Sequence, residues 1–526
     1  MKHALTKKSI IKHTLQVGGN TFVSRLLGLA REILQVKFLG VGVVADAFTA
    51  AFFLPNSFRK IFAEGALTAA FFPTFIKVYK KEGIEKANGL MSLSFLCFEG
   101  VVFLLCLFVM VFPVLTINLT FPGFSQEQIA AAVPCLRILM PFIFFLSTSS
   151  LLTGALHSVH HFFVPAFASI ILNVFYVGGI LLCLHYGWPV EYLCFAILAS
   201  GFFQCLLHFI AYFSLGFTFS LPDKDALKHF GEVFLKFLPC FLAMSVMEVN
   251  LFVDQRFASY LHEGSVKLIN LANRFMGIPL GVFSVAFSTI LLPHFTRVSS
   301  YAPRRLSFYL LESTKFVFWV TIPATIMMSY LASDIFLTIF ASSSSKKFPV
   351  HLISESGWIL VGFLLGLFFF SLNKILLTLY YSFRDTLTPT YTAIAATIIN
   401  YGLNYVLVGR FGSFGLALAT SISGCIQMLL SLYLLCRLHK FKLYGHYFWN
   451  FATRYIVQLI VVFIPFYGIY KGVRMAAEQV FSNHTLGFFM LQSFGYWIWA
   501  APLMAACFYV LYVTRKMFKV KVYFLD

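Results

Sequence analysis

The chain has 526 residues, of which 60% are hydrophobic and 11% carry a charge. Soluble domains contain roughly 25% charged residues, so this composition excludes an ordinary soluble protein and indicates an all-α integral membrane protein. The formal net charge of +19 fits basic cytoplasmic loops and attraction to anionic membrane lipids, and we expect no nucleic-acid partner.

The first two apolar stretches are unusual because they contain many charges. The charged residues of this region are Arg25, Arg31, Glu32, Lys37, Asp46, Arg59, Lys60 and Glu64. A charge at membrane depth is costly unless it faces protein or water, so we expect these side chains to line an interior cavity. Guanidinium groups bind phosphate oxygens in a bidentate manner and stay charged at physiological pH, which makes a pyrophosphate a suitable ligand.

A second interpretation is that these charges neutralise each other, Arg31 with Asp46 and Lys60 with Glu64. Bases outnumber acids five to three in this stretch, so internal pairing is incomplete. We therefore favour an anion site that contains Arg25, Arg31 and Arg59, with Asp46, Lys60 and Glu64 in gating or charge pairing.

Further along the chain, Arg274 occupies the position that corresponds to the charged part of the second span. It is a candidate fourth cavity arginine. Its alternative role is to anchor a helix end at the membrane interface by snorkelling.

A spanning helix needs about 20 apolar residues, and on that scale the sequence predicts about fourteen spans. Every second loop is basic, as is the C-terminus: Lys77, Lys80, Lys81, Lys86, Arg297, Arg304, Arg305, Arg437, Lys440, Lys442, Arg515, Lys516, Lys519 and Lys521. By the positive-inside rule, the protein is a multi-pass protein with both termini in the cytoplasm.

The two halves of the chain resemble each other at an offset of about 220 residues. The matched prolines are Pro73 with Pro293 and Pro165 with Pro389. Shared apolar composition alone is the competing explanation, but the shared proline, asparagine and Leu-Leu-Thr positions favour a true repeat. The repeat predicts two pseudo-symmetric six-helix lobes around a central cavity, residues 1–222 and 223–442, followed by two extra helices in residues 443–526.

Carboxylate and amide side chains form a third group. Asp254 lies in the seventh span, Asn400 and Asn404 in the eleventh and Thr420 in the twelfth. Oxygen ligands of these types suit a hard cation such as sodium. Hydrogen bonding between helices is the alternative role for the same side chains.

Catalytic motifs are missing from the sequence: it contains no G-x-S-x-G, H-E-x-x-H or P-loop lysine motif. We therefore expect a transporter rather than an enzyme, with no required cofactor.

Three segments resemble the MurJ (MviN) family of lipid II flippases, in the multidrug/oligosaccharidyl-lipid/polysaccharide exporter superfamily. They are SRLLGLAREILQVKFLGVGVVADAF, LPNSFRKIFAEGALTAAFFPTF and GSVKLINLANRFMGIPLGVFSVAFSTILLPHF. The resemblance implies a fourteen-helix transporter that moves undecaprenyl-pyrophosphate-linked disaccharide pentapeptide to the outer leaflet of the bacterial cytoplasmic membrane, for peptidoglycan synthesis.

The resemblance also implies roles for single residues. Arg25, Arg31, Arg59 and Arg274 match the family's cavity arginines, Asp46 and Glu64 its acidic positions, and Asp254, Asn400, Asn404 and Thr420 its sodium site. Asn404 replaces an acid of the family pattern, so sodium would bind more weakly. The last two helices would receive the polyprenyl tail.

Two other functions compete with this one: a flippase for another lipid-linked oligosaccharide, of the O-antigen type, and a multidrug exporter of the same superfamily. Drug exporters act mostly on cations, and the excess of arginine argues against that choice. We expect a monomer, with cell-wall synthesis proteins as candidate partners.

Overall fold

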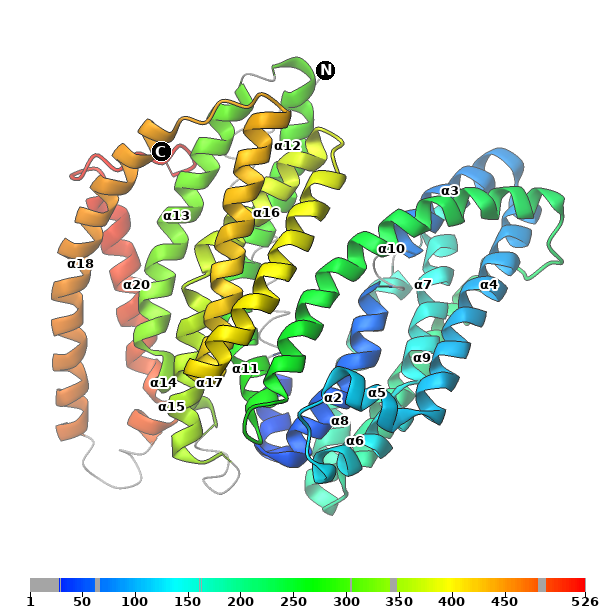
Figure 1. The fold of residues 1–526 in the computed structure, drawn as a ribbon, viewed down its shortest axis with the longest axis horizontal. Coiled ribbons are helices and arrows are strands. Elements are labelled where there is room, and N and C mark those ends of the chain that lie inside the picture. The colour runs from blue at the N-terminus through cyan, green and yellow to red at the C-terminus, as the bar shows by residue number, and fades with distance from the viewer. Residues whose placement is uncertain are drawn as a thin grey trace. The chain divides into compact units, whose positions relative to one another are not determined.

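The computed structural model describes residues 28, 30–61, 67–159, 161, 163–302, 305–340, 348–480 and 489–525. The described residues form helices joined by short connections (Figure 1). They divide into two compact units, one of Ala30–Lys267 and the other of Leu268–Asp526 together with Gly28.

The first unit begins with helical residues 30–39. Its further helices are α2 (Val43–Phe58), α3 (Leu67–Glu82), α4 (Ile84–Val111), α5 (Pro113–Thr120), α6 (Gln126–Leu139), α7 (Phe142–Ser158), α8 (Phe163–Tyr186), α9 (Val190–Ser214) and α10 (Lys224–Ala258). Helix α11 (Ser265–Pro279) starts here and continues into the second unit.

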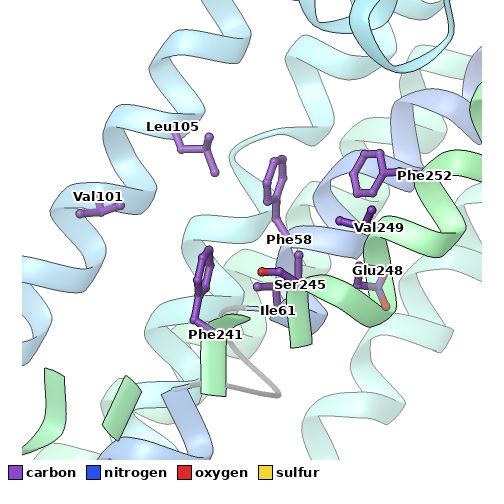
Figure 2. A pocket seen from close by; sticks show the side chains of 9 residues that line it. All are labelled: Phe58, Ile61, Val101, Leu105, Phe241, Ser245, Glu248, Val249 and Phe252. Atoms are coloured by element: carbon purple, nitrogen blue, oxygen red, sulfur yellow. The ribbon is translucent and has the colours of Figure 1, made fainter. Parts of the chain in front are cut away.

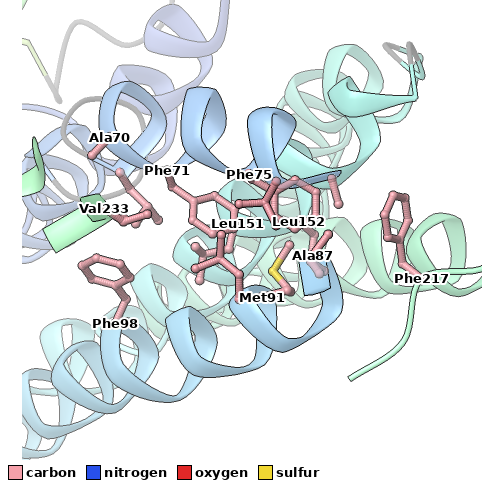
Figure 3. Close-up of a cluster of buried hydrophobic side chains, with 14 of the residues drawn as sticks. Ala70, Phe71, Phe75, Ala87, Met91, Phe98, Leu151, Leu152, Phe217 and Val233 are labelled. Atoms are coloured by element: carbon pink, nitrogen blue, oxygen red, sulfur yellow. The ribbon is translucent and has the colours of Figure 1, made fainter. Parts of the chain in front are cut away.

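Helices α3, α4, α7 and α10 enclose an aromatic-rich core (Figure 3). Phe71 and Phe75 of α3 pack there with Leu151 of α7 and Met91 of α4, and all four side chains are fully buried. Aromatic and aliphatic groups of this size supply most of the packing energy in a core. The core therefore holds α10 against α3 and α4.

The second unit contains the remaining helices: η2 (Leu280–Val285), α12 (Ala286–Tyr301), α13 (Leu306–Tyr330), α14 (Ala332–Phe340), α15 (Val350–Leu364), α16 (Leu367–Ser382), α17 (Leu387–Leu438), α18 (Gly445–Val480) and α20 (Tyr496–Thr514). Helices α12, α13, α16 and α17 share a core around Phe287, Leu376 and Met428. Helices α18 and α20 lie side by side next to α13 (Figure 1).

Both halves of the chain contain the same local breaks, which supports the predicted repeat. Gly187, between α8 and α9, has φ 69°, and Gly412, inside α17, has φ 55°. The interval between these glycines equals that between Leu151 and Leu376. Because the left-handed region favours glycine, the same residue type ends a helix at the same place in both repeats. Helix α17 is accordingly two helices joined across a kink at Gly412.

The prolines of the repeat also occupy equivalent positions. Pro165 is the third residue of α8 and Pro389 the third residue of α17. Near Pro73 and Pro293 each half contains a wide π-helical turn, at residues 59–61 and Leu280–Val285. Such turns occur often at functional sites, and the first one contains Arg59.

Among the described residues, nine helices are long and apolar enough to span a membrane, or up to eleven if each of two bent helix pairs is one span. The pairs are α13 with α14, bent by 61°, and residues 351–364 of α15 with α16, bent by 41°. The prediction of an all-α multi-pass membrane protein is confirmed, whereas the number fourteen stays a prediction.

The compact units do not follow the predicted lobe boundaries at residues 222 and 442. Helix α10, placed by the repeat in the second lobe, packs against α3 and α4 in the first unit. A lobe defined by the repeat and a unit defined by packing are different divisions of the chain, so the lobe boundaries stay a prediction.

Candidate functional site

A buried ion pair lies in the first unit between the first described helix and the start of α11. The ammonium nitrogen of Lys267 is 2.9 Å from a carboxylate oxygen of Glu32. Lys267 is 2% exposed and Glu32 7%. Burying either charge alone would cost several kcal/mol, so each side chain requires the other. Glu32 is therefore neutralised by Lys267, which the sequence analysis did not consider.

Asp46 of α2 receives three hydrogen bonds in the same region. Its oxygens accept from the backbone N–H of Gly264 at 2.6 Å and of Lys267 at 2.8 Å, and from Nε2 of Gln128 at 3.2 Å. The two backbone donors belong to the first turn of α11 and the residue before it, where a carboxylate is stabilised by the helix dipole. Asp46 thus caps α11, and the interpretation that it pairs with Arg31 is wrong.

Gly264 makes this cap sterically feasible. Its φ is +92°, and an added Cβ would lie 2.6 Å from Cγ1 of Val41. A side chain here would be strained by both the backbone conformation and the close contact. Gly264 therefore allows the chain to turn next to Asp46, so that its backbone N–H can reach the carboxylate.

Arg31 is fixed by an aromatic ring and by a long ion pair. Its guanidinium carbon lies 4.8 Å from the ring centroid of Tyr176, and Nη2 is 4.0 Å from Glu32. The Tyr176 hydroxyl donates to Oε1 of Gln35 at 3.2 Å. The Nε of Arg31 is buried and has no hydrogen-bond partner among the described residues. A buried donor without an acceptor is costly, so Arg31 retains capacity for an anionic ligand.

Lys60 pairs with Glu248 of α10, with Nζ 3.2 Å from Oε1. The Lys60 side chain is 36% exposed and that of Glu248 10%. The alternative partner considered from the sequence, Glu64, lies outside the described residues. The pair joins the end of α2 to α10 across 188 positions of the sequence, a separation that helix spacing cannot predict.

Glu248 also borders an apolar pocket of about 270 Å³ in the first unit (Figure 2). The other lining residues come from α2, α4, α10 and the turn after α2: Phe58, Ile61, Val101, Leu105, Phe241, Ser245, Val249 and Phe252. Val101 is 55% exposed and Val249 47%, so the pocket reaches the surface of the unit. An apolar pocket with a charge pair at its margin suits an amphipathic ligand.

The remaining cavity arginines are in different situations. Arg59 donates from Nε and Nη2 to Oδ1 of Asn56, at 3.3 and 3.0 Å. Arg274 of α11 is exposed, and its Nη1 would be 3.4 Å from a Cβ added at Gly28. Arg25 lies outside the described residues. The shared arginine cavity therefore stays a prediction.

The candidate sodium ligands are divided between the two units. Asn400 and Asn404 of α17 are fully buried, and the Thr420 hydroxyl, beyond the kink in the same helix, donates to the carbonyl of Leu416 at 3.0 Å. Asp254 of α10 is 5% exposed and belongs to the first unit. The sodium site also stays a prediction.

Comparison with known proteins identifies the family. The family model described as "Lipid II flippase MurJ" matches residues 35–495. The chain belongs to the MurJ family. A probable lipid II flippase MurJ of Rhizobium tropici is 32% identical over 441 residues, covering 81% of each chain. The lipid II flippase MurJ of Burkholderia cenocepacia is 30% identical over 430 residues, covering 80% of this chain and 83% of the relative.

Solved structures agree with membership of the MurJ family. An inward-closed lipid II flippase MurJ matches with a TM-score of 0.76 and 25% identity, covering 94% of this chain and 98% of the other. An inward-facing multidrug MATE-family transporter matches with a TM-score of 0.65 and 17% identity, over 79% of this chain and 94% of the other. The second likeness concerns the fold alone. The family predicted from the three sequence segments is confirmed.

The sequence patterns did not single out Lys267, Lys374 or Glu99 as candidate functional residues. Lys267 lies seven residues before Arg274 in an otherwise uncharged run, and this spacing was an available signal. Lys374 is the one charge of α16, and Glu99 is the one charge of α4 beyond its first turn. A lone charge in such a helix is a functional candidate by its cost alone.

Proposed function

We propose that this chain translocates lipid II, the undecaprenyl-pyrophosphate-linked peptidoglycan precursor, from the inner to the outer leaflet of the bacterial cytoplasmic membrane. The family match over residues 35–495 carries the proposal. As a transporter of the MurJ family it changes the location of its substrate and forms no covalent bond.

Arginines within the membrane-spanning region support binding of the pyrophosphate. Arg31 is held over Tyr176 and keeps a buried Nε without a partner among the described residues. A guanidinium in this setting should bind a phosphate oxygen strongly, because charge-assisted hydrogen bonds are stronger in a low dielectric. Arg25, Arg59 and Arg274 are proposed to contribute to the same anion site.

Alternating access is the proposed transport mechanism. The arginines capture the pyrophosphate and sugars in an inward-open cavity while the polyprenyl tail remains in the bilayer. Rocking of the two repeats then exposes the headgroup to the other side. The apolar surfaces of α18 and α20 are proposed to contact the tail; Ile464 is 68% exposed and Ile498 62%.

Orientation follows from the charges of the loops. Basic residues in alternate loops place both termini in the cytoplasm. Asp254, Asn400, Asn404 and Thr420 are proposed to bind sodium as a coupling or structural ion, and we propose that the protein acts as a monomer.

The test is a leaflet-accessibility assay for labelled lipid II in a bacterium depleted of its own flippase and expressing this chain. Wild type should expose lipid II on the outer leaflet and restore growth. Arg31→Ala should insert into the membrane but lose both lipid II exposure and growth. Arg31→Lys should recover only part of each, since an ammonium lacks the planar guanidinium fork.

Tyr176→Phe is the matched control. It keeps the ring beneath Arg31 and removes only the hydroxyl that bonds Gln35, so it should retain activity. Full growth of Arg31→Ala would contradict the anion site. Export of a lipid-linked O-antigen precursor or a cationic drug, without lipid II, would replace the proposed substrate.

A further inference from the structure

Glu99 is a buried acid without a counter-charge in the first unit. It lies in α4, a helix apolar enough to span the membrane, and is 2% exposed. Neither carboxylate oxygen has a hydrogen-bond partner among the described residues. An ionised carboxylate in this setting would have lost its hydrating water without a compensating ion pair or hydrogen bond, so the ionised form would be strongly disfavoured.

The groups around Glu99 are polar but uncharged. The hydroxyls of Ser147 and Thr148 on α7 lie beside its carboxyl. The Thr148 hydroxyl is itself buried and lacks a hydrogen-bond partner among the described residues. A carboxyl that carried a proton could donate to such a hydroxyl.

Several basic side chains on the helices packed against α4 have other contacts. Lys77 of α3 pairs with Glu232 of α10 at 3.2 Å, and Lys236 of α10 donates to Thr74 at 3.0 Å. Three further groups on these helices and on α4 also have partners: Lys86 with Asp223 and Asp225, His229 with Glu82, and Arg137 with the carbonyl of Met110. Lys80 and Lys81 lie in the last turn of α3, at its charged end. None of these bases is a counter-ion for Glu99.

Three other buried acids of the same unit have identified partners. Glu32 pairs with Lys267, Glu248 with Lys60, and Asp46 accepts two backbone N–H groups. Each of these three acids therefore has an ion-pair or hydrogen-bond partner within the unit. Glu99 is the exception among these four.

Helix α13 of the second unit carries a neutral residue at the same distance from its start. Thr321 is as far from the start of α13 as Glu99 is from the start of α4. Thr321 is buried, and its hydroxyl donates to the carbonyl of Val317 within its own helix. A long apolar helix of this protein thus accommodates a buried polar residue without a charge.

We propose that Glu99 is a proton-binding site: it holds a proton in the conformation described here, with the hydroxyls of Ser147 and Thr148 as the neighbouring acceptors available to that proton, and releases it to water when transport opens this bundle. Release leaves a carboxylate, and uptake restores the neutral carboxyl. The coupling of this cycle to transport rests on the proposed flippase function, whereas the protonation itself does not.

Infrared difference spectroscopy in bilayers tests the protonation. The spectrum of wild type minus Glu99→Gln should contain the carbonyl band of a protonated carboxyl at neutral pH. Glu85→Gln is the matched control on the same helix, because Glu85 is exposed in the first turn of α4 and should contribute carboxylate bands only. A carboxylate band alone from Glu99 would overturn the proposal.

A second variant covers the case in which Glu99→Gln does not fold. Thr148→Val keeps the carboxyl and removes one hydroxyl acceptor, so the protonated-carboxyl band should move to higher frequency. If the band is unchanged in both Thr148→Val and Ser147→Ala, the proposal that the Glu99 proton interacts with these hydroxyls is wrong.

Transport measurements test the coupling. Wild-type lipid II flipping should change with pH, by up to about tenfold per pH unit for a single proton, and Glu99→Gln should remove that dependence. A pH response that persists unchanged in Glu99→Gln would overturn the coupling. If wild type flips no lipid II at any pH, the proposed function fails, while the infrared result still decides the proton site.

Discussion

The ammonium of Lys267 lies 2.9 Å from the carboxylate of Glu32, although 235 positions separate them in the chain. The backbone N–H of the same lysine donates to Asp46 at 2.8 Å. Lys267 therefore connects the first described helix, α2 and the start of α11. From the sequence, the charges of the first two spans were predicted to line a cavity. Two of them, Glu32 and Asp46, instead bind Lys267 and hold helices of this unit together.

Breaking this ion pair should destabilise the protein. Lys267→Met leaves Glu32 buried without its partner, and we expect unfolding free energy to fall by about 3–5 kcal/mol. The double variant Glu32→Gln with Lys267→Met should regain most of that loss, because no charge remains uncompensated. Thermal unfolding in detergent measures both; a single variant as stable as wild type would refute the role of the pair.

Gly264 should not tolerate a side chain. Gly264→Ala places a Cβ at 2.6 Å from Val41 at φ +92°, and we expect a loss of about 1–3 kcal/mol in unfolding free energy. Gly100→Ala is the control, since nothing lies within 4 Å of a Cβ there. Val41→Ala added to Gly264→Ala should recover part of the loss. Equal stability of Gly264→Ala and Gly100→Ala would contradict the steric argument.

Asp385, in the connection between α16 and α17, should make stability depend on pH. Burial alone would raise its pKa, but hydrogen bonds from Thr388 and His439 outweigh that effect and hold the pKa of Asp385 below its usual value. A lowered pKa in the folded state means that the stabilisation is present above the unfolded pKa and disappears as the pH falls through the folded value.

Asp385→Asn should therefore be less stable than wild type at neutral pH and equally stable in strong acid. Unfolding temperatures of both proteins, measured from neutral pH to strong acid, check whether the stability difference shrinks as the pH falls. A difference that grows on acidification would contradict it.

The proposed sodium site makes a gain-of-function prediction. Asn404→Asp adds a second carboxylate to the ligand set, so the sodium concentration needed for thermal protection should fall by about tenfold. Asp254→Asn should abolish the protection. Potassium serves as the control ion, and an unchanged sodium response in both variants would leave only the hydrogen-bonding role of these side chains.

The membrane class and the helical content were predictable from the sequence, because they depend on composition and local geometry; the repeat stays a prediction. Gly187 and Gly412 illustrate this: each is the residue type that favours a positive φ, and each occurs where its repeat requires a break. The family segments around Arg31, Arg59 and Arg274 likewise identified the MurJ family without any coordinates.

Only the tertiary structure decided which charges are compensated. Glu32, Asp46 and Lys60 find partners at Lys267, Gly264 and Glu248, far away in sequence. Glu99 finds none among the described residues. Helical periodicity predicts contacts within a few residues along one helix, whereas an ion pair between helices depends on how their faces pack. The cost of a buried charge could be recognised in the sequence, but the group that offsets it could not.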